Sequence, residues 1–553
     1  MKQSTDIPLT PLFVSMFMGT HQSNRFDIAI VGAGFAGMYA LKQAVDSGRS
    51  AIVFERGDDV GGTWYWNRYP GARCDVQSME YSYSFDTQLQ QDWQWTERFA
   101  AQPEILRYAQ HVADRFHLRD HIRFNTVVAS ADYQDTENEW RIETGAGDEV
   151  FAKTCIMATG CLSSTNRPAF DGIDVFEGEQ YHTGLWPHHP VDFSGKRVGI
   201  IGTGSSAIQS IPIIAESAAH LTVFQRTANY SIPAHNGPID EAYAADIRSN
   251  YDDFRERNKQ MFAGFGADQA RSDLSVFEVS DEEREARFEV KWQEGGLGFT
   301  STFGDLGRSQ PANQIAAEFV RDKIRATVND PQVAELLCPD QVIGCKRVCV
   351  DTNYYKTYNR DNVTLITVRD TPIERLTKTG LIVDDTAFDF DMIIFATGFD
   401  AMTGSLLKID VTGREGVKLA NKWAAGPTTY LGLGVHGFPN LFMVSGPGSP
   451  SVLSNMIVTI EQHVDFIFTC LDFLKLSGFT TIEAEAEAEA AWVAQCNSIA
   501  GETLFPTCNS WYLGANVPGK PRIFMPFVGG FPLYQSICEE VRTANYKGFR
   551  LAS

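Results

Sequence analysis

Two glycine-rich turns constrain this chain most strongly, because each lies between a short apolar run and a helical pattern. The first turn, Gly32–Gly37, follows the β-type run Phe26–Val31 and precedes a second such run that ends at Glu55. The second turn, Gly202–Ala207, follows Lys196–Ile201 in the same way. A strand, a glycine turn and a helix in this order are typical of a nucleotide-binding βαβ unit. The sequence therefore predicts an α/β protein with two Rossmann-like dinucleotide-binding domains.

The first turn has the spacing of a dinucleotide fingerprint. Gly32 permits the tight turn, Gly34 lets the backbone approach a diphosphate, and Gly37 allows the helix to pack closely on the strand. The helix N-terminus favours an anion, and Glu55 can accept hydrogen bonds from an adenosine ribose. A glycine turn with a surface glutamate is the alternative. These residues suit FAD or NAD, and FAD is favoured by the flexible turn and aromatic ring that follow, at Gly62, Thr63 and Trp64.

The second turn has the same design, but the strand after it ends at Arg226 rather than at an acid. A guanidinium can bind a 2′-phosphate with two hydrogen bonds, whereas a carboxylate would repel it. The sequence therefore predicts NADPH rather than NADH here. A surface ion pair of Arg226 is the alternative, although exposed pairs contribute only about 0–1 kcal/mol. The predicted ligands of this cofactor are Gly202, Gly204, Ala207, Arg226, Thr227 and Lys346.

The chain has 553 residues, which is too long for one hydrophobic core. Between about 230 and 340 the sequence becomes charged and helix-favouring, and Ser280–Glu283 reads as a capping box. We therefore expect a helical insertion. The predicted division is an N-terminal arm at 1–24, an FAD-binding domain at 25–160 and 396–553, an NADP-binding domain at 161–229 and 340–395, and the insertion at 230–339.

Composition narrows the partners and the location. A formal charge of −22 argues against nucleic acid or an anionic membrane as a partner. The ten cysteines form no CxxC pair, so we expect no disulfide, no structural zinc or other metal, and a cytoplasmic location. We expect a monomer or a weak oligomer. The run Glu483–Glu489, with a charge at every second residue, predicts a solvated helix.

The segment between the two turns matches the pattern FxGxxxHxxxWP, through Phe176, Gly178, His182, Trp186 and Pro187. This pattern, just ahead of a second GxGxxA turn, resembles the signature of the type I Baeyer–Villiger monooxygenases. The resemblance extends from about residue 25 to the C-terminus and includes Trp64–Asp75, Gly344–Arg347 and Trp511–Gly519. The loop Gly446–Met456 is similar to the phenylacetone-type branch of that family rather than to the cyclohexanone-type branch.

The resemblance implies a reaction cycle. NADPH reduces FAD, the reduced flavin captures O2 as a C4a-peroxide, and this attacks a ketone to give an ester or lactone. By family position, Arg347 is the cation that stabilises the peroxide anion, and Asp75 is its carboxylate partner. A structural ion pair for Arg347 and a turn acid for Asp75 are the alternatives.

The resemblance implies further roles outside the chemistry itself. His182 and Trp186 are implied to couple domain movement, and a satisfied linker histidine is equally compatible with the sequence. Trp511 is a candidate to close over the nicotinamide, with a core tryptophan as the alternative. Apolar loop residues that form the substrate wall are predicted to be Leu453 and Met456.

Other functions fit less well. A flavin-containing monooxygenase that oxidises soft nitrogen or sulfur resembles a pattern without Trp186–Pro187, and a flavin disulfide reductase needs a cysteine pair where Cys74 stands alone. A non-catalytic FAD/NADP-binding sensor has no need for Arg347 beside Asp75. The identity of the ketone cannot be deduced from the sequence.

Overall fold

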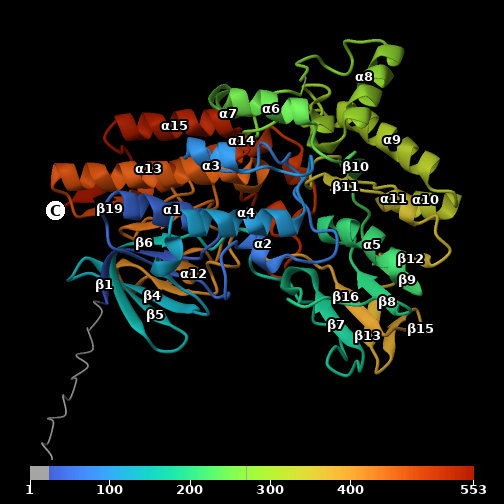
Figure 1. Ribbon diagram of the computed structural model, residues 1–553, viewed down its shortest axis with the longest axis horizontal. Coiled ribbons are helices and arrows are strands. Elements are labelled where there is room, and N and C mark those ends of the chain that lie inside the picture. The colour runs from blue at the N-terminus through green and yellow to red at the C-terminus, as the bar shows by residue number, and fades with distance from the viewer. Residues whose placement is uncertain (1–23, 270) are drawn as a thin grey trace, which may run out of the picture.

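The computed structural model describes residues 24–269 and 271–553. Two sheets rich in parallel strands lie side by side, with helices packed on and above them (Figure 1). The predicted N-terminal arm at 1–24 lies, up to residue 23, outside the described residues. The α/β class predicted from the two glycine turns is confirmed, because each turn connects a parallel strand to a helix.

The first sheet is built around β1 (Arg25–Val31), which pairs in parallel with β2 (Ala51–Phe54) and β6 (Glu149–Met157). Helix α1 (Phe35–Asp46) connects β1 to β2. The strand order is β17-β4-β5-β6-β1-β2-β3, with β18 also paired to β6. The other strands of this sheet are β3 (Ile122–Arg123), β4 (Val128–Gln134), β5 (Glu139–Thr144), β17 (Asp410–Thr412) and β18 (Leu441–Met443).

The second sheet contains five parallel strands in the order β12-β9-β8-β16-β7. Helix α5 (Ser205–Ser217) connects β8 to β9, and side chains such as Ile200, Leu221 and Ile394 are fully buried. Both faces of the sheet are covered, as expected for apolar parallel strands. One face packs on α5, and the other packs on the antiparallel sheet of β13 (Ile373–Leu376), β14 (Gly380–Val383) and β15 (Thr386–Asp389). The parallel strands are β7 (Glu179–His182), β8 (Arg197–Ile201), β9 (His220–Gln225), β12 (Val363–Thr367) and β16 (Met392–Phe395).

The C-terminal part of the chain returns to the first sheet. Strand β18 pairs with β6, and helix α13 (Met456–Ser477) packs on α1. Helix α15 (Phe531–Thr543) packs on α13 (Figure 1). No helix in the described part of the chain is both long and apolar enough to cross a bilayer. The pairing of β18 supports grouping 396–553 with 25–160, and the domain bounds themselves stay a prediction.

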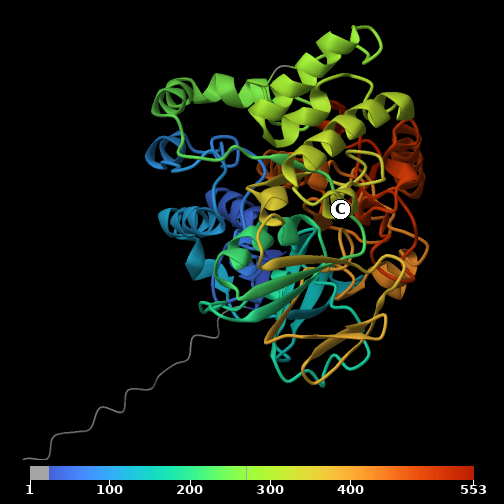
Figure 2. The same cartoon turned by 90° about the vertical axis from the view of Figure 1, so that its right-hand side faces the viewer.

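The region 230–339 contains mainly helices. Its helices are α6 (Glu241–Ser249), α7 (Tyr251–Lys259), α8 (Asp281–Glu294), α9 (Gln310–Thr327) and α10 (Pro331–Leu337). Helices α8, α9 and α10 lie above the second sheet, whereas α6 and α7 pack on the first nucleotide unit (Figures 1 and 2). The N-cap half of the predicted capping box is present: the Ser280 side chain accepts a hydrogen bond from the Glu283 N–H at the start of α8, while the Glu283 carboxylate accepts from Arg287. Strands β10 (Ser231–Pro233) and β11 (Cys349–Asp351) pair at the base of this region.

The prediction of a solvated helix at Glu483–Glu489 is wrong for part of the run. Glu483 lies in strand β19 (Thr481–Ala484), is 4% exposed, and pairs with Arg550 at 2.6 Å. Helix α14 (Ala486–Gly501) begins later, and Glu489 is buried against Lys422. A buried carboxylate requires a cationic or N–H partner, and here the partners are too distant in sequence for a local pattern to reveal them.

A buried carboxyl group, Glu80, lies where the helical insertion meets the first nucleotide unit. Its Oε1 accepts a hydrogen bond from the Gly266 N–H at 2.7 Å, and its Oε2 has no hydrogen-bond partner. Its backbone carbonyl accepts hydrogen bonds from Arg255 and Asn455. Burial raises the pKa of Glu80 to about 7. The neutral acid is therefore the form that the folded protein favours.

We predict that Glu80→Gln weakens the pH dependence of stability. Between the ordinary pKa of 4.5 and about 7, the folded state keeps a proton that the unfolded state has lost. The free energy of unfolding of the wild type should therefore fall as pH rises through this window, by roughly 3 kcal/mol. Thermal melts of both proteins at pH 5 and pH 8 measure the effect. The variant should gain stability relative to the wild type at pH 8. Glu487→Gln, at an exposed position, is the control. A difference in melting temperature between the wild type and Glu80→Gln that is the same at both pH values would refute the prediction.

Candidate active site

A cavity of about 1480 Å³ lies at the carboxyl ends of the strands of the second sheet. Its wall includes the turns that directly follow β8, β9 and β16. Ligands of open α/β sheets bind at this edge. The predicted site residues that line the cavity are Thr63, Trp64, Asp75, Gly202, Gly204, Arg226, Thr227, Lys346, Arg347, Met456 and Trp511.

Other predicted residues lie outside this wall. Leu453 is half-buried in the hydrophobic cluster that also contains Val452 and Met456, and of these three only Val452 and Met456 line the cavity. The substrate-wall prediction is therefore closer to the structure for Met456 than for Leu453. The predicted cofactor ligands that do not form part of the wall are Gly32, Gly34, Gly37, Glu55, Gly62 and Ala207.

The first glycine turn fits the diphosphate of a flavin nucleotide. Helix α1 begins after Gly34 without a side-chain cap, which leaves the N–H groups of its first turn available to an anion. A Cβ on Gly34 would lie 3.3 Å from the Gly62 Cα, so the backbones of the two glycines approach each other closely and leave no room for a side chain. A Cβ on Gly37 would lie 1.8 Å from the Gly32 carbonyl oxygen, so only glycine permits this packing of helix on strand.

The end of β2 and the turn after it complete the first nucleotide unit. Glu55 is buried, and its two carboxylate oxygens accept hydrogen bonds from the N–H groups of Ala33 and Gly57, each at 2.8 Å. Each oxygen keeps a lone pair that can accept from a ribose hydroxyl. Trp64 is 7% exposed and donates from Nε1 to the Tyr81 hydroxyl, which fixes its ring at the cavity wall. These donors, acceptors and aromatic walls fit FAD.

The second glycine turn and two cations face the cavity. Helix α5 begins after Gly204 without a side-chain cap, and a Cβ on Gly204 would meet nothing within 4 Å. The Thr227 carbonyl accepts a hydrogen bond from Thr203, which fixes the strand end that carries Arg226. Burial lowers the pKa of Lys346, and the nearby charge of Arg226 lowers it further. Two neighbouring cations at the wall of one cavity fit a phosphate group.

Arg347 and Asp75 form a bidentate ion pair at the cavity wall. Arg347 donates from Nε to Asp75 Oδ2 at 2.6 Å and from Nη2 to Oδ1 at 2.8 Å. Its Nη1 donates to the Val452 carbonyl at 2.6 Å. Burial by itself lowers the pKa of the guanidinium, but Asp75 more than offsets this, so the net pKa is raised. Three of its five N–H groups are thus engaged, and the Tyr512 side chain also interacts with the guanidinium, so a ligand would share the remaining N–H groups with that tyrosine.

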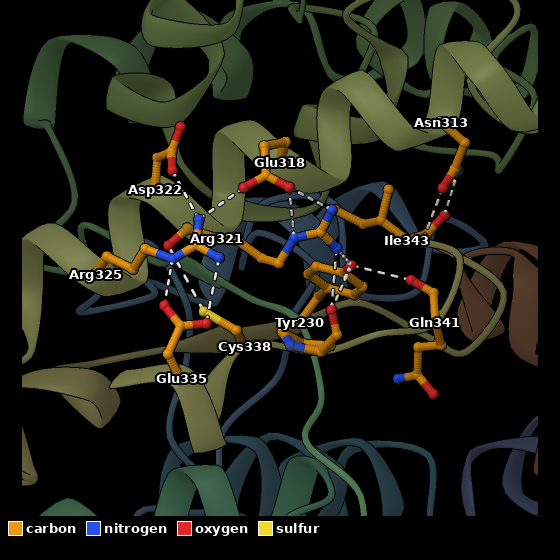
Figure 3. Close-up of polar contacts among 11 residues, drawn as sticks. Tyr230, Asn313, Glu318, Arg321, Asp322, Arg325, Glu335, Cys338, Gln341 and Ile343 are labelled. Atoms are coloured by element: carbon orange, nitrogen blue, oxygen red, sulfur yellow. Dashed lines mark hydrogen bonds and ion pairs between the residues drawn. The ribbon is translucent and has the colours of Figure 1, made fainter. Parts of the chain in front are cut away.

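The segment 338–347, which we call the strap, carries Lys346 and Arg347 and is fixed by helix α9 (Figure 3). Arg321 of α9 donates to the Pro339 carbonyl at 3.1 Å and to the Tyr230 hydroxyl at 2.9 Å. That hydroxyl donates in turn to carbonyls of the strap. The sequence did not reveal this cluster, because nothing local marks an arginine on a charged helix as buried.

The strap is fixed again closer to its end. Asn313 of α9 donates to the Ile343 carbonyl and accepts from the Ile343 N–H, both at 2.9 Å (Figure 3). Cys345 then forms a disulfide with Cys508 across a sequence separation of 163. The prediction that the chain has no disulfide is therefore wrong. Disulfides require a Cα–Cα distance of about 4.4–6.8 Å, and tertiary folding brings these two Cα atoms to 6.1 Å.

The linker motif runs through β7, an edge strand of the second sheet, and lies outside the cavity wall. It comprises Phe176, Gly178, His182, Trp186 and Pro187. His182 ends β7; its Nδ1 accepts from the Gly184 N–H at 3.0 Å and its Nε2 lies 3.3 Å from the Thr397 hydroxyl. Burial lowers the pKa of His182, so the neutral ring is favoured. Phe176 and Trp186 are buried in two different hydrophobic clusters. A role in domain coupling stays a prediction.

Comparisons with known proteins agree with this geometry. A family model described as flavin-binding monooxygenase-like matches residues 25–248. A Baeyer–Villiger monooxygenase of Pseudooceanicola batsensis is 42% identical over 526 residues, which cover 94% of this chain and 95% of that protein. This chain belongs to the Baeyer–Villiger monooxygenases. The family, the fold class and the enzyme class predicted from the sequence are confirmed, and the chain is a flavoprotein monooxygenase that uses FAD and NADPH to oxidise a ketone.

Solved structures support the same assignment. The structure of an oxidised steroid monooxygenase bound to NADP is 51% identical with a TM-score of 0.91, covering 96% of this chain and 99% of that chain. A closed structure of cyclohexanone monooxygenase is 40% identical with a TM-score of 0.94, covering 96% of this chain and 100% of that chain. The fold of this chain therefore matches the folds of both solved monooxygenases over nearly its whole length.

The cation pair at the second turn yields a prediction about cofactor choice. Arg226→Ala in this Baeyer–Villiger monooxygenase should raise the KM for NADPH by about 10- to 100-fold, the value of one charge-assisted bidentate contact. The KM for NADH should change little, because NADH lacks the 2′-phosphate. Steady-state kinetics with both cofactors measure this. Arg167→Ala, an exposed cation of the same cavity, is the control. Equal changes for both cofactors would remove Arg226 from the phosphate site.

Proposed function

We propose that Arg347 is the catalytic cation of this Baeyer–Villiger monooxygenase, that Asp75 positions it, and that the substrate is a bulky ketone converted to an ester or lactone. One observation carries the proposal. The Arg347–Asp75 pair faces a cavity whose wall contains Trp64 of the first nucleotide unit and Gly204 of the second. A single cation is thus accessible to groups held by either unit.

The chain supplies a permanent charge where oxygen chemistry needs it. When bound, FAD accepts a hydride from NADPH and, once reduced, activates O2 for attack on the ketone. Arg347 holds a positive charge at the cavity wall that cannot be lost at working pH. A preorganised cation stabilises negative charge that develops on a nearby oxygen. Asp75 and the Val452 carbonyl orient the guanidinium and so fix its charge at the cavity wall for that task.

Water exclusion is the second contribution of the chain. Large apolar side chains line the cavity beside Arg347, among them Trp64, Met456 and Trp511. A site with less water strengthens electrostatic interactions and suppresses side reactions of unstable intermediates. The rings of Trp511 and its neighbour Tyr512 pack against each other, with their centroids 4.2 Å apart.

The volume of the cavity and one similar protein favour a bulky ketone, although other relatives are named for cyclohexanone, cyclopentanone and acetone. The cavity of about 1480 Å³ exceeds what small cyclic ketones require, although the nicotinamide cofactor occupies part of it. The relative that is 51% identical is a steroid monooxygenase. Val452, Ser454 and Met456 contribute the wall from the loop that resembles the phenylacetone-type branch. Leu453 would influence the substrate only through these neighbours.

The proposal also includes the oligomeric state and the cellular location. A monomer or weak oligomer in the cytoplasm is consistent with an NADPH-dependent enzyme. The Cys345–Cys508 disulfide is unusual for that compartment, where such bonds are mostly catalytic or redox-sensing. The rival activities, oxidation of soft nitrogen or sulfur and cofactor sensing without turnover, differ in their products and can be separated in one assay.

The test supplies FAD-loaded protein with NADPH, O2 and a panel of steroid, aryl and small cyclic ketones, plus a sulfide and an aromatic amine. NADPH oxidation and product mass are followed together. We expect the bulky ketones to gain one oxygen atom in step with NADPH loss. A preference for the small ketones would refute the substrate proposal. Oxidation of the sulfide or amine alone, or NADPH loss without any oxygenated product, would refute the activity.

Arg347→Ala tests the catalytic assignment. Loss of one preorganised stabilising group costs on the order of 10²–10³ in rate, so ester formation should fall at least that far while FAD stays bound, because the first glycine turn is unchanged. Flavin absorbance and product formation at saturating NADPH measure both effects. Lys346→Ala, the adjacent cation on the strap, should instead raise the KM for NADPH. Ester formation that survives in Arg347→Ala would exclude Arg347 as the catalytic cation.

A further inference from the structure

The disulfide joins two segments that both contribute to the cavity wall. Cys345 directly precedes Lys346 and Arg347 on the strap, and Cys508 precedes Trp511 on the loop 507–518. Cys345 is 2% exposed, whereas Cys508 is partly exposed and itself lines the cavity. A bond with one sulfur at an accessible wall can be reached by a small thiol. The disulfide lies two residues from the proposed catalytic cation Arg347, so it can influence the position of that side chain.

The two sides of the bond are held very differently. The strap is fixed by Asn313 and Arg321, as described above, so Cys345 is a rigid anchor. Across the described residues, no hydrogen bond connects positions 507–511 to the strap. The side-chain bond of Asn509 within this stretch goes to Arg522, which is exposed. The disulfide is therefore the covalent connection between positions 507–511 and the strap, and the contact of Tyr512 with Arg347 follows one residue after Trp511.

The geometry next to the bond explains why the connection matters. Burial raises the pKa of Tyr512 and the charge of Arg347 opposes that rise, which places the tyrosine hydroxyl close to the guanidinium. Tyr512 is 1% exposed, and its neighbour Trp511 lines the cavity. Release of Cys508 removes a fixed point three positions before Trp511. Displacement of this loop would open the wall beside Arg347 to water.

We propose that Cys345 and Cys508 are positioning residues, whose disulfide holds the Trp511 loop closed against the Arg347 strap and thereby couples NADPH oxidation to oxygen insertion. This inference rests on the proposed function of Arg347. The closed loop keeps water away from the site where oxygen is activated, and loss of that exclusion diverts reducing equivalents into unproductive turnover. The other eight cysteines are free thiols and take no part.

A dithiol opens the bond by two exchange steps. A thiolate of the dithiol attacks Sγ of Cys508, the S–S bond breaks, and Cys345 leaves as a thiolate that takes up a proton. The second thiolate of the reagent then attacks the mixed disulfide, and Cys508 leaves as the second thiol. Two electrons pass from the dithiol to the protein, and the reagent becomes a cyclic disulfide. After the reagent is removed, the enzyme differs from the oxidised form only in its two cysteine thiols.

The experiment compares four samples of the FAD-loaded enzyme: oxidised wild type, wild type reduced with dithiothreitol and desalted without air, Cys508→Ser, and Cys345→Ser. Thiols are first counted in denaturant without reductant. The oxidised wild type should show eight, because ten cysteines include one disulfide. Ester formed per NADPH consumed, the KM for NADPH, and hydrogen exchange of residues 507–518 are then measured with a melting curve for each sample.

We expect the reduced enzyme and both variants to behave alike. The fraction of NADPH consumed without ester should rise at least about twofold, and exchange at 507–518 should increase while FAD stays bound. Treatment of Cys508→Ser with dithiothreitol is the matched control and should change nothing further.

Several outcomes would overturn the proposal. Ten thiols in the oxidised protein would show that the bond does not form. A fall in melting temperature with unchanged coupling and unchanged exchange would reduce the bond to a structural crosslink. Failure of the oxidised wild type itself to make any ester would contradict the proposed function, which separates that failure from failure of the tether.

Discussion

The bidentate ion pair of Arg347 with Asp75 joins parts of the chain that are 272 positions apart. Asp75 belongs to the segment that follows the first glycine turn, Arg347 to the strap beside the second unit, and Val452 of the C-terminal part receives the third hydrogen bond. Charges taken out of water are costly unless geometry and hydrogen bonds compensate them. Here the side chains are 27% and 21% exposed toward the cavity, so the pair keeps contact with the space where a ligand binds.

The position of the Arg347 side chain depends on the elements that hold the strap in place. Helix α9 holds the strap from one side through Arg321 and Asn313, and the disulfide holds it from the other. Sites of this kind need side chains whose own positions are fixed by further contacts. The helical insertion thus acts as a support for the strap, although none of its helices carries a predicted catalytic group. The insertion also buries Glu80 where it meets the first unit, and this burial raises the pKa of that carboxyl group.

The sequence predicted what local patterns and elementary chemistry can determine. The glycine turns, the strands around them, the caps and the arginine at the end of β9 follow from spacing and residue type, and the structure has these strands within one or two residues of their predicted bounds. The pairing of Asp75 with Arg347 came from the family resemblance rather than from spacing, since only the tertiary fold brings the two together.

The features that the sequence missed share one physical cause. The Cys345–Cys508 bond, the Arg321–Tyr230 cluster and the burial of Glu483 all depend on partners far away in the chain. The role of Leu453 in the substrate wall stays a prediction; it lies in a short 3₁₀ turn, Ser451–Leu453, and shares a hydrophobic cluster with Val452 and Met456. Periodicity identifies an element, but it does not tell which side chains of a loop reach a cavity.

The central claim is that a fixed guanidinium stands where oxygen is activated. A crystal structure of this protein with FAD and NADP⁺ bound tests it most directly. The account predicts that Arg347 remains paired with Asp75 and contacts the flavin ring, with the 2′-phosphate on Arg226 and Lys346. A guanidinium that lies away from the flavin, while both cofactors occupy their predicted turns, would contradict it.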